Sequence, residues 1–120
     1  MDIEHLRDFC LALDGVEEKT PFGKFAMRYD GILVFYVCGH MFCMTDMENY
    51  TGVTIKLPPE RVAELHETRS ACSVPINLSE RHWIQLNFGG DIHRDEILQM
   101  VRQSYEIVKR LYSRKSKNKH

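Results

Sequence analysis

Two thiols and an imidazole lie close together in the sequence and could bind a metal ion. Cys38, His40 and Cys43 fall within six residues, and thiolate and imidazole are the groups that zinc prefers. The spacing C-x-H-x-x-C matches no zinc signature, and the sequence offers no obvious fourth ligand. In a pair of alternating strands, both cysteines are more simply small core residues, with His40 exposed in a Gly39-His40 turn. We therefore expect no metal and no cofactor.

A catalytic site is the second possibility, because a Cys or Ser nucleophile needs a His as base and a third group that orients the His. His82 could serve as the base, but a half-buried structural histidine is the simpler interpretation. The sequence contains no P-loop, G-x-G-x-x-G, G-x-S-x-G or H-E-x-x-H motif. An enzyme would need His82 or His40 near a thiol or carboxylate in a cleft. No motif predicts one, and we assign no catalytic residues.

Basic side chains could contact phosphates, and they are unevenly distributed. The net charge is only −1, yet residues 109–120 contain six Lys or Arg and no acid. Residues 1–108 are left with ten Lys or Arg against seventeen Asp or Glu, a charge of −7. We expect one domain over residues 1–112 and a basic, flexible tail over 113–120. The tail is interpreted either as a phosphate contact or as a solvated terminus.

Composition is typical of a single globular domain. The chain has 120 residues, 43% hydrophobic and 28% charged, which excludes a disordered or collagen-like protein. Its longest apolar run, Ile32–Cys38, is seven residues, against about 18 for a membrane span. The acidic start is not a signal peptide, and the four cysteines follow no disulfide pattern. These features predict a cytoplasmic protein with free thiols and no membrane partner.

The periodicity of apolar residues predicts an α+β domain with an antiparallel sheet. Asp2 is a good N-cap for a first helix that ends at Asp14-Gly15, and residues 17–23 read as a loop. We expect Ile32–Cys38 to be a central strand covered on both sides, because it has no polar face. Pro59 suits the first turn of a helix. The predicted strands are 25–29, 32–38, 41–45, 53–57 and 82–88, with a short extended piece near 73–76, and the later helices are 59–68 and 94–113.

Three polar residues in these elements have structural interpretations. Ser104 and Tyr105 lie on the buried stripe of the last helix. The Ser104 hydroxyl can bond the carbonyl of Met100, one turn back, while the Tyr105 hydroxyl reaches a loop. Lys56, on the polar side of its strand, is interpreted as solvated, although next to Arg28 or Arg81 it could contact a phosphate.

Taken in order, these segments resemble the MmcQ/YjbR family over about residues 3–112. No single segment is diagnostic, but their order and spacing together are fairly specific. The segments that carry the likeness are Leu6, 10–18, Pro21-Phe22-Gly23, 39–42, Thr45-Asp46, 53–61, Arg81-His82-Trp83, Gly90-Asp91 and Ser104-Tyr105 with 106–108.

The resemblance implies a curved antiparallel sheet with helices packed on it, similar to frataxin-type and secretion-chaperone-type folds. It also implies DNA binding through a double-wing motif, in which hairpin loops would contact phosphates. An adaptor that binds a protein partner or small ligand, in a groove lined by Trp83, Tyr36 and Phe22, is the alternative. The candidate phosphate contacts are Lys24, Arg28, Lys56, Arg81, Lys109, Arg110, Arg114, Lys115, Lys117 and Lys119.

Overall fold

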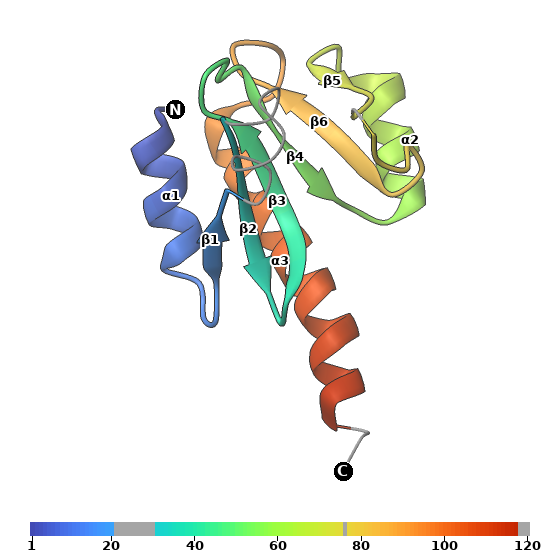
Figure 1. Ribbon diagram of the computed structural model, residues 1–120. Coiled ribbons are helices and arrows are strands. Elements are labelled where there is room, and N and C mark those ends of the chain that lie inside the picture. Colours follow the sequence, from blue (N-terminus) through green and yellow to red (C-terminus); the bar gives the residue numbers. More distant parts are fainter. Residues whose placement is uncertain (21–30, 76, 118–120) are drawn as a thin grey trace.

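A six-stranded antiparallel sheet with helices packed against it forms the protein (Figure 1). The computed structural model describes residues 1–20, 31–75 and 77–117. Within them the strand order is β1-β2-β3-β4-β6-β5, which confirms the predicted α+β class. The elements are α1 (Ile3–Leu11), β1 (Glu17–Lys19), β2 (Ile32–Val37), β3 (His40–Asp46), β4 (Gly52–Lys56), α2 (Pro59–Thr68), β5 (Cys72–Ser73), β6 (Trp83–Asn87) and α3 (Arg94–Lys117).

The local signals for helix starts are confirmed. The Asp2 carboxylate accepts the backbone N–H of His5 at 2.8 Å and so caps α1. Pro59 is the first residue of α2, which ends at the predicted Thr68. The alternating stretch 25–29 lies outside the described residues.

The core lies between the sheet and the helices α1 and α3. Alternate residues of each strand point toward this layer, because side chains in a strand alternate between its two faces. We call this face of the sheet the inner face and the opposite one the outer face. The fully buried inner residues include Phe35, Phe42, Val53, Ile55, Ile84 and Leu86.

The prediction that β2 is an interior strand covered on both sides is confirmed over its middle, where the consecutive residues Leu33, Val34 and Phe35 are all buried. The strand is the second from one edge, because β1, in a segment predicted to be a loop, pairs with it. Three residues are too few to show an alternating pattern in the sequence. The burial is less complete at two positions of β2, since Ile32 and Tyr36 are half-buried.

The turn between β2 and β3 also differs from the prediction. Cys38 and Gly39 both have positive φ, 54° and 77°, and Val37 pairs with His40. This is a two-residue hairpin turn of the type whose twist matches the flanking strands. Cys38 is therefore exposed in the turn and is not a core residue, whereas Cys43 is fully buried as predicted. His40 is exposed, as expected, but as the first residue of β3.

Ser104 joins α3 to two strands at a bulge. Phe35 pairs with Cys43 and Tyr36 with Met41, so Phe42 is an extra residue in β3. The Ser104 hydroxyl donates to the Phe42 carbonyl at 2.5 Å and accepts the Lys56 N–H at 2.9 Å. The predicted bond to Met100 is therefore wrong. The two backbone groups are available because β3 and β4 pair directly only at two positions, Cys43–Ile55 and Met44–Thr54.

The helix α3 is longer than predicted and leaves the globule. It was expected to end at Ser113 but continues to Lys117, since the sequence contains no helix breaker there. Val108 is its last buried residue among those described. Further on, the Tyr112 ring stacks on His40, with 3.4 Å between ring centroids, and the final turns extend past the β2–β3 hairpin (Figure 1). In the described part of the chain, no helix is long and apolar enough to cross a membrane.

Candidate functional site

One end of the sheet collects several of the residues that could contact a ligand. The strands are antiparallel, so β2 and β4 end where β3 and β6 begin. The helix α3 leaves the globule at the same end, where Tyr112 contacts His40. We call this region the hairpin end and define it as Tyr36, His40, Lys56, Arg81, Trp83 and α3 from Lys109 to Lys117.

On the outer face, two half-buried aromatic rings each lie next to a lysine. Phe35, Ile55 and Ile84 point inward, so their neighbours in the strands point outward. These outward neighbours include Tyr36, Lys56 and Trp83. The Lys56 Nζ lies 5.9 Å from the centroid of the Trp83 ring, and the Lys19 Nζ lies 5.4 Å from that of Tyr36. Both are cation–π contacts, each worth about 0.5–1 kcal/mol at an exposed site.

Most cations of the globule are already paired with carboxylates. Four arginines outside the hairpin end form such pairs: Arg7 with Glu4 and Glu18, Arg61 with Glu64, Arg69 with Glu96, and Arg102 with Glu106. The pairing favours the ionised form of the carboxylates. The hydrogen bond from Arg7, for example, lowers the pKa of Glu18.

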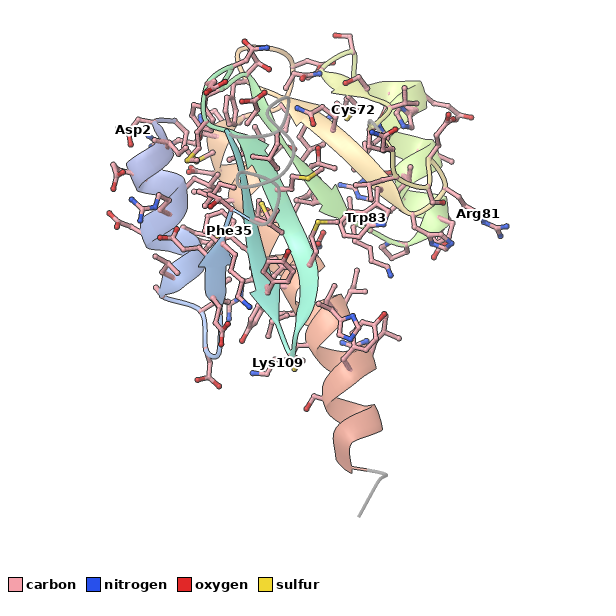
Figure 2. The ribbon with its side chains drawn as sticks, in the orientation of Figure 1. Asp2, Phe35, Cys72, Arg81, Trp83 and Lys109 are labelled. Atoms are coloured by element: carbon pink, nitrogen blue, oxygen red, sulfur yellow. The ribbon has the colours of Figure 1, made fainter. Side chains whose placement is uncertain are left out.

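Three cations near the hairpin end differ from these. Among the residues that the structure describes, Lys56, Arg81 and Arg110 form no ion pair. Figure 2 shows Arg81 pointing outward, on the same side of the molecule as Trp83. These three charges can approach a phosphate without breaking an existing ion pair.

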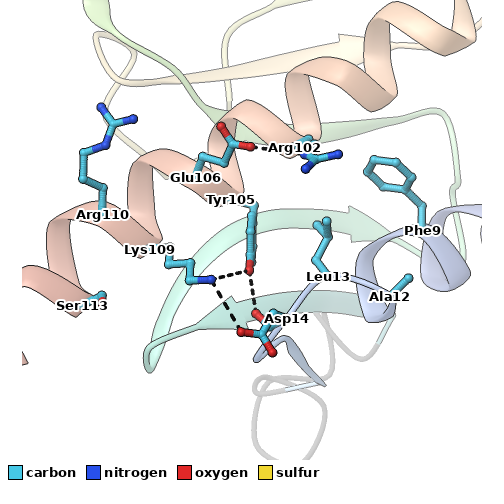
Figure 3. Close-up of a pocket in the computed structure, with 10 residues that line it drawn as sticks. All are labelled: Phe9, Ala12, Leu13, Asp14, Arg102, Tyr105, Glu106, Lys109, Arg110 and Ser113. Carbon is cyan, nitrogen blue, oxygen red and sulfur yellow. Dashed lines mark hydrogen bonds and ion pairs between the residues drawn. The ribbon is translucent and has the colours of Figure 1, made fainter.

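Lys109 has a structural role in addition to its charge. Its Nζ lies 3.2 Å from the Tyr105 hydroxyl and 3.6 Å from the Asp14 carboxylate (Figure 3). The Tyr105 hydroxyl donates to the Asp14 carbonyl at 2.7 Å, which confirms the expected contact with a loop. The hydrogen bond to Tyr105 raises the pKa of Lys109. Together these contacts attach α3 to the end of α1.

A cleft of about 1060 Å³ lies between α1 and α3 (Figure 3). One wall comes from α1 and the residues that follow it and is apolar except for Asp14, and the other comes from α3 and is mostly charged. Sequence reasoning did not find this cleft, although its charged residues recur on one side of α3 at helical spacing. The lining residues are Phe9, Ala12, Leu13, Asp14, Arg102, Tyr105, Glu106, Lys109, Arg110 and Ser113.

The structure separates the predicted phosphate contacts into two groups. Lys56 and Arg81 lie on the sheet side of the hairpin end, whereas Lys109 and Arg110 lie on α3 beside the cleft. Positions 114, 115 and 117 form the final turn of α3. Lys24, Arg28, Lys119 and the segment Pro21-Phe22-Gly23 lie outside the described residues. Of the predicted groove, Trp83 and Tyr36 share the outer face, and Phe22 is not described.

The family-motif residues that the structure describes hold the fold together. Ser104 joins β3, β4 and α3, and Tyr105 joins α3 to the loop after α1. The backbone of His82 accepts the N–H of Leu57 at 3.0 Å and so extends the β4–β6 pairing by one bond. The contacts of these three motif residues therefore stabilise the fold of the domain and do not by themselves indicate a ligand site.

One protein family and several solved structures are similar to this chain. A family model described as YjbR matches residues 11–107. The crystal structure of the Deinococcus radiodurans protein DR2400, which has a DUF419 family-model domain, is similar with a TM-score of 0.79. It is 26% identical, and the match covers 89% of this chain and 78% of that one. A protein from Pseudomonas syringae shares the fold, with a TM-score of 0.71, 16% identity, and 90% and 99% of the two chains covered. No curated protein matches the chain significantly.

Proposed function

The chain belongs to the YjbR family, and we propose that it is a cytoplasmic protein that binds DNA weakly and non-specifically through phosphate contacts at the hairpin end. The principal element is the final part of α3, with Lys56 and Arg81 as supporting contacts on the sheet side.

One observation carries the proposal: the acid-free basic segment of the sequence continues a helix that extends beyond the globule. From residue 109 to the last residue of α3, the chain holds five cations and no carboxylate. The arginines of the globule, in contrast, mostly face carboxylates within hydrogen-bond distance. Affinity for DNA comes largely from cations that replace condensed counterions at the phosphates. The end of α3 is therefore the part of the molecule best suited to contact a nucleic-acid backbone.

The charge distribution also limits how tight this binding can be. The charge of −7 over residues 1–108 repels DNA from most of the surface. Non-specific complexes have dissociation constants of roughly 10⁻⁴–10⁻⁶ M at physiological salt, and we expect this protein to lie at the weak end of that range.

A charge-neutral variant tests the role of α3 with little change to the fold. Arg114→Gln/Lys115→Gln/Lys117→Gln removes three charges beyond the last buried residue of the helix. Arg61→Gln/Arg94→Gln/Arg102→Gln removes three charges elsewhere, at the half-buried Arg61 and the exposed Arg94 and Arg102, and is the matched control. In anisotropy titrations of a labelled duplex, the first variant should reduce the slope of log affinity against log salt by about 3, and the control by less than about 1. An equal loss in both variants would mean that only net charge matters and would contradict the proposal.

The cleft between α1 and α3 favours a second candidate function, the binding of a small ligand or a partner segment. Its volume of about 1060 Å³ is at the upper end of ligand pockets, and an apolar wall faces a charged one. Leu13→Arg would place a cation on the apolar wall. If the cleft binds a ligand that copurifies with the protein, native mass spectrometry should show the bound mass in the wild type and not in Leu13→Arg. If the wild-type protein shows only the mass of the unliganded chain, this result would count against the function.

A further inference from the structure

We infer that the outer face of the hairpin end binds single-stranded DNA, with bases stacked on Tyr36 and Trp83. This inference rests on the proposed function and names its substrate class. It starts from the two aromatic rings with adjacent lysines, a combination that the phosphate-contact proposal does not use.

Next to the Tyr36 ring is a hollow large enough for a base. The hollow has a volume of about 520 Å³ and is lined by Gly15, Glu17, Lys19, Tyr36, Cys38 and Gly39. The Glu17 carboxylate lies 3.6 Å from the Lys19 Nζ and neutralises that lysine. A phosphate would be repelled by Glu17, whereas an uncharged base can stack on the ring. The chemistry of this hollow therefore favours a base.

The surroundings of Trp83 favour a base and a phosphate together. Lys56 contacts the ring, and neither Lys56 nor Arg81 forms an ion pair among the described residues. Base stacking is a stronger contact than an exposed cation–π pair. A base can therefore replace the Lys56 ammonium over the ring, and the long lysine side chain can then reach the adjacent phosphate.

The two rings are spaced for a short stretch of single strand. Tyr36 is on β2 and Trp83 on β6, and the order β2-β3-β4-β6 separates them by three strand spacings, about 14 Å across the sheet. Half-buried Met41 pairs with Tyr36 on the same face and adds polarizable surface between the rings. Bases in a duplex already stack on one another, so only an unpaired strand presents base faces to such a surface.

Trp83 provides a direct probe, because it is the only tryptophan in the chain. A labelled DNA strand of about 12 nucleotides, alone or annealed to its complement, is titrated while anisotropy and Trp83 emission are both recorded. We expect the single strand to bind more tightly than the duplex and to quench Trp83. Tyr36→Ala should weaken single-strand binding by about fivefold or more, with little effect on the duplex, and Tyr36→Phe should restore it. The exposed change Arg81→Gln should weaken single-strand binding more than the control Arg94→Gln, which provides a test even if Tyr36→Ala does not fold.

Two different failures separate the inference from the proposed function. If anisotropy shows binding but Trp83 emission does not change and Tyr36→Ala binds as the wild type does, the stacking inference is overturned and phosphate contact at α3 stands. If neither form of the DNA changes anisotropy, the proposed function is overturned, and the inference that rests on it is overturned as well.

Discussion

Replacing Ser104 with alanine should destabilise the protein far more than the loss of one oxygen atom suggests. The Ser104 hydroxyl is fully buried, and it bonds the Phe42 carbonyl and the Lys56 N–H at once. Alanine bonds neither group, and at this position water is excluded. A buried backbone group left without a partner costs about 1–3 kcal/mol, so the two groups together give about 2–6 kcal/mol. This is a large fraction of the 5–15 kcal/mol that typically stabilises a domain.

Tyr105→Phe is the matched comparison. It also removes one hydroxyl from α3, and that hydroxyl also bonds a backbone carbonyl, at Asp14. Asp14 is exposed, so water can replace the lost partner. We expect a loss of about 1 kcal/mol for Tyr105→Phe, clearly smaller than that for Ser104→Ala.

Urea denaturation followed by Trp83 fluorescence measures both changes. Trp83 lies opposite Lys56 in the β4–β6 ladder, so its emission reports on the region that Ser104 supports. A loss below about 1 kcal/mol for Ser104→Ala, or a loss no greater than that for Tyr105→Phe, would refute the reasoning that Ser104 satisfies two buried backbone groups.

Three further outcomes follow from the structure. Stability should fall as the pH drops below about 4.5, because the hydrogen bond from Arg7 lowers the pKa of Glu18 in the folded state. Pairing stabilises the fold while Glu18 is ionised and is lost on protonation, so Glu18→Gln should weaken the pH dependence measured by thermal unfolding. A thiol reagent should modify exposed Cys38 quickly and Cys43 only as fast as the protein unfolds, because the hydrogen bond that the Cys43 thiol makes with Cys10 and its burial both raise the pKa of Cys43; rapid labelling of Cys43, located by peptide mass spectrometry, would contradict this. Gly52→Ala should prevent stable folding, detected by circular dichroism, because its Cβ would lie 2.3 Å from a backbone oxygen of β6.

Signals that depend on neighbouring residues alone predicted much of the fold. Asp2 capped the first helix, Pro59 began the second, and the alternation of Val53, Ile55 and Leu57 gave the inward side of β4. Each of these is a local backbone or periodicity effect, which a single sequence records directly.

Features that depend on contacts distant in the sequence were not predictable in this way. The partners of Ser104 are 62 and 48 residues away, and they become available only because Phe42 is an extra residue in β3. A short edge strand such as β1 forms only because β2 lies beside it.

The candidate site was predictable only in part. The distribution of charged residues along the sequence identified the basic segment that begins at Lys109. The sequence could not show that Lys109 itself contacts Tyr105 and Asp14, or that Tyr36 shares the outer face with Trp83, because both depend on how α3 and the strands meet.

The dependence of DNA affinity on salt tests the central claim most directly. Full-length protein is titrated into a labelled duplex at about 50, 100 and 200 mM salt, and the logarithm of the association constant is plotted against that of the salt concentration. Five to six phosphate contacts, from the end of α3 and from Lys56 and Arg81 on the sheet side, predict a slope of about −4.5 to −5.5. A slope near zero, or no binding at the lowest salt, would contradict the claim that the hairpin end binds DNA through its phosphates.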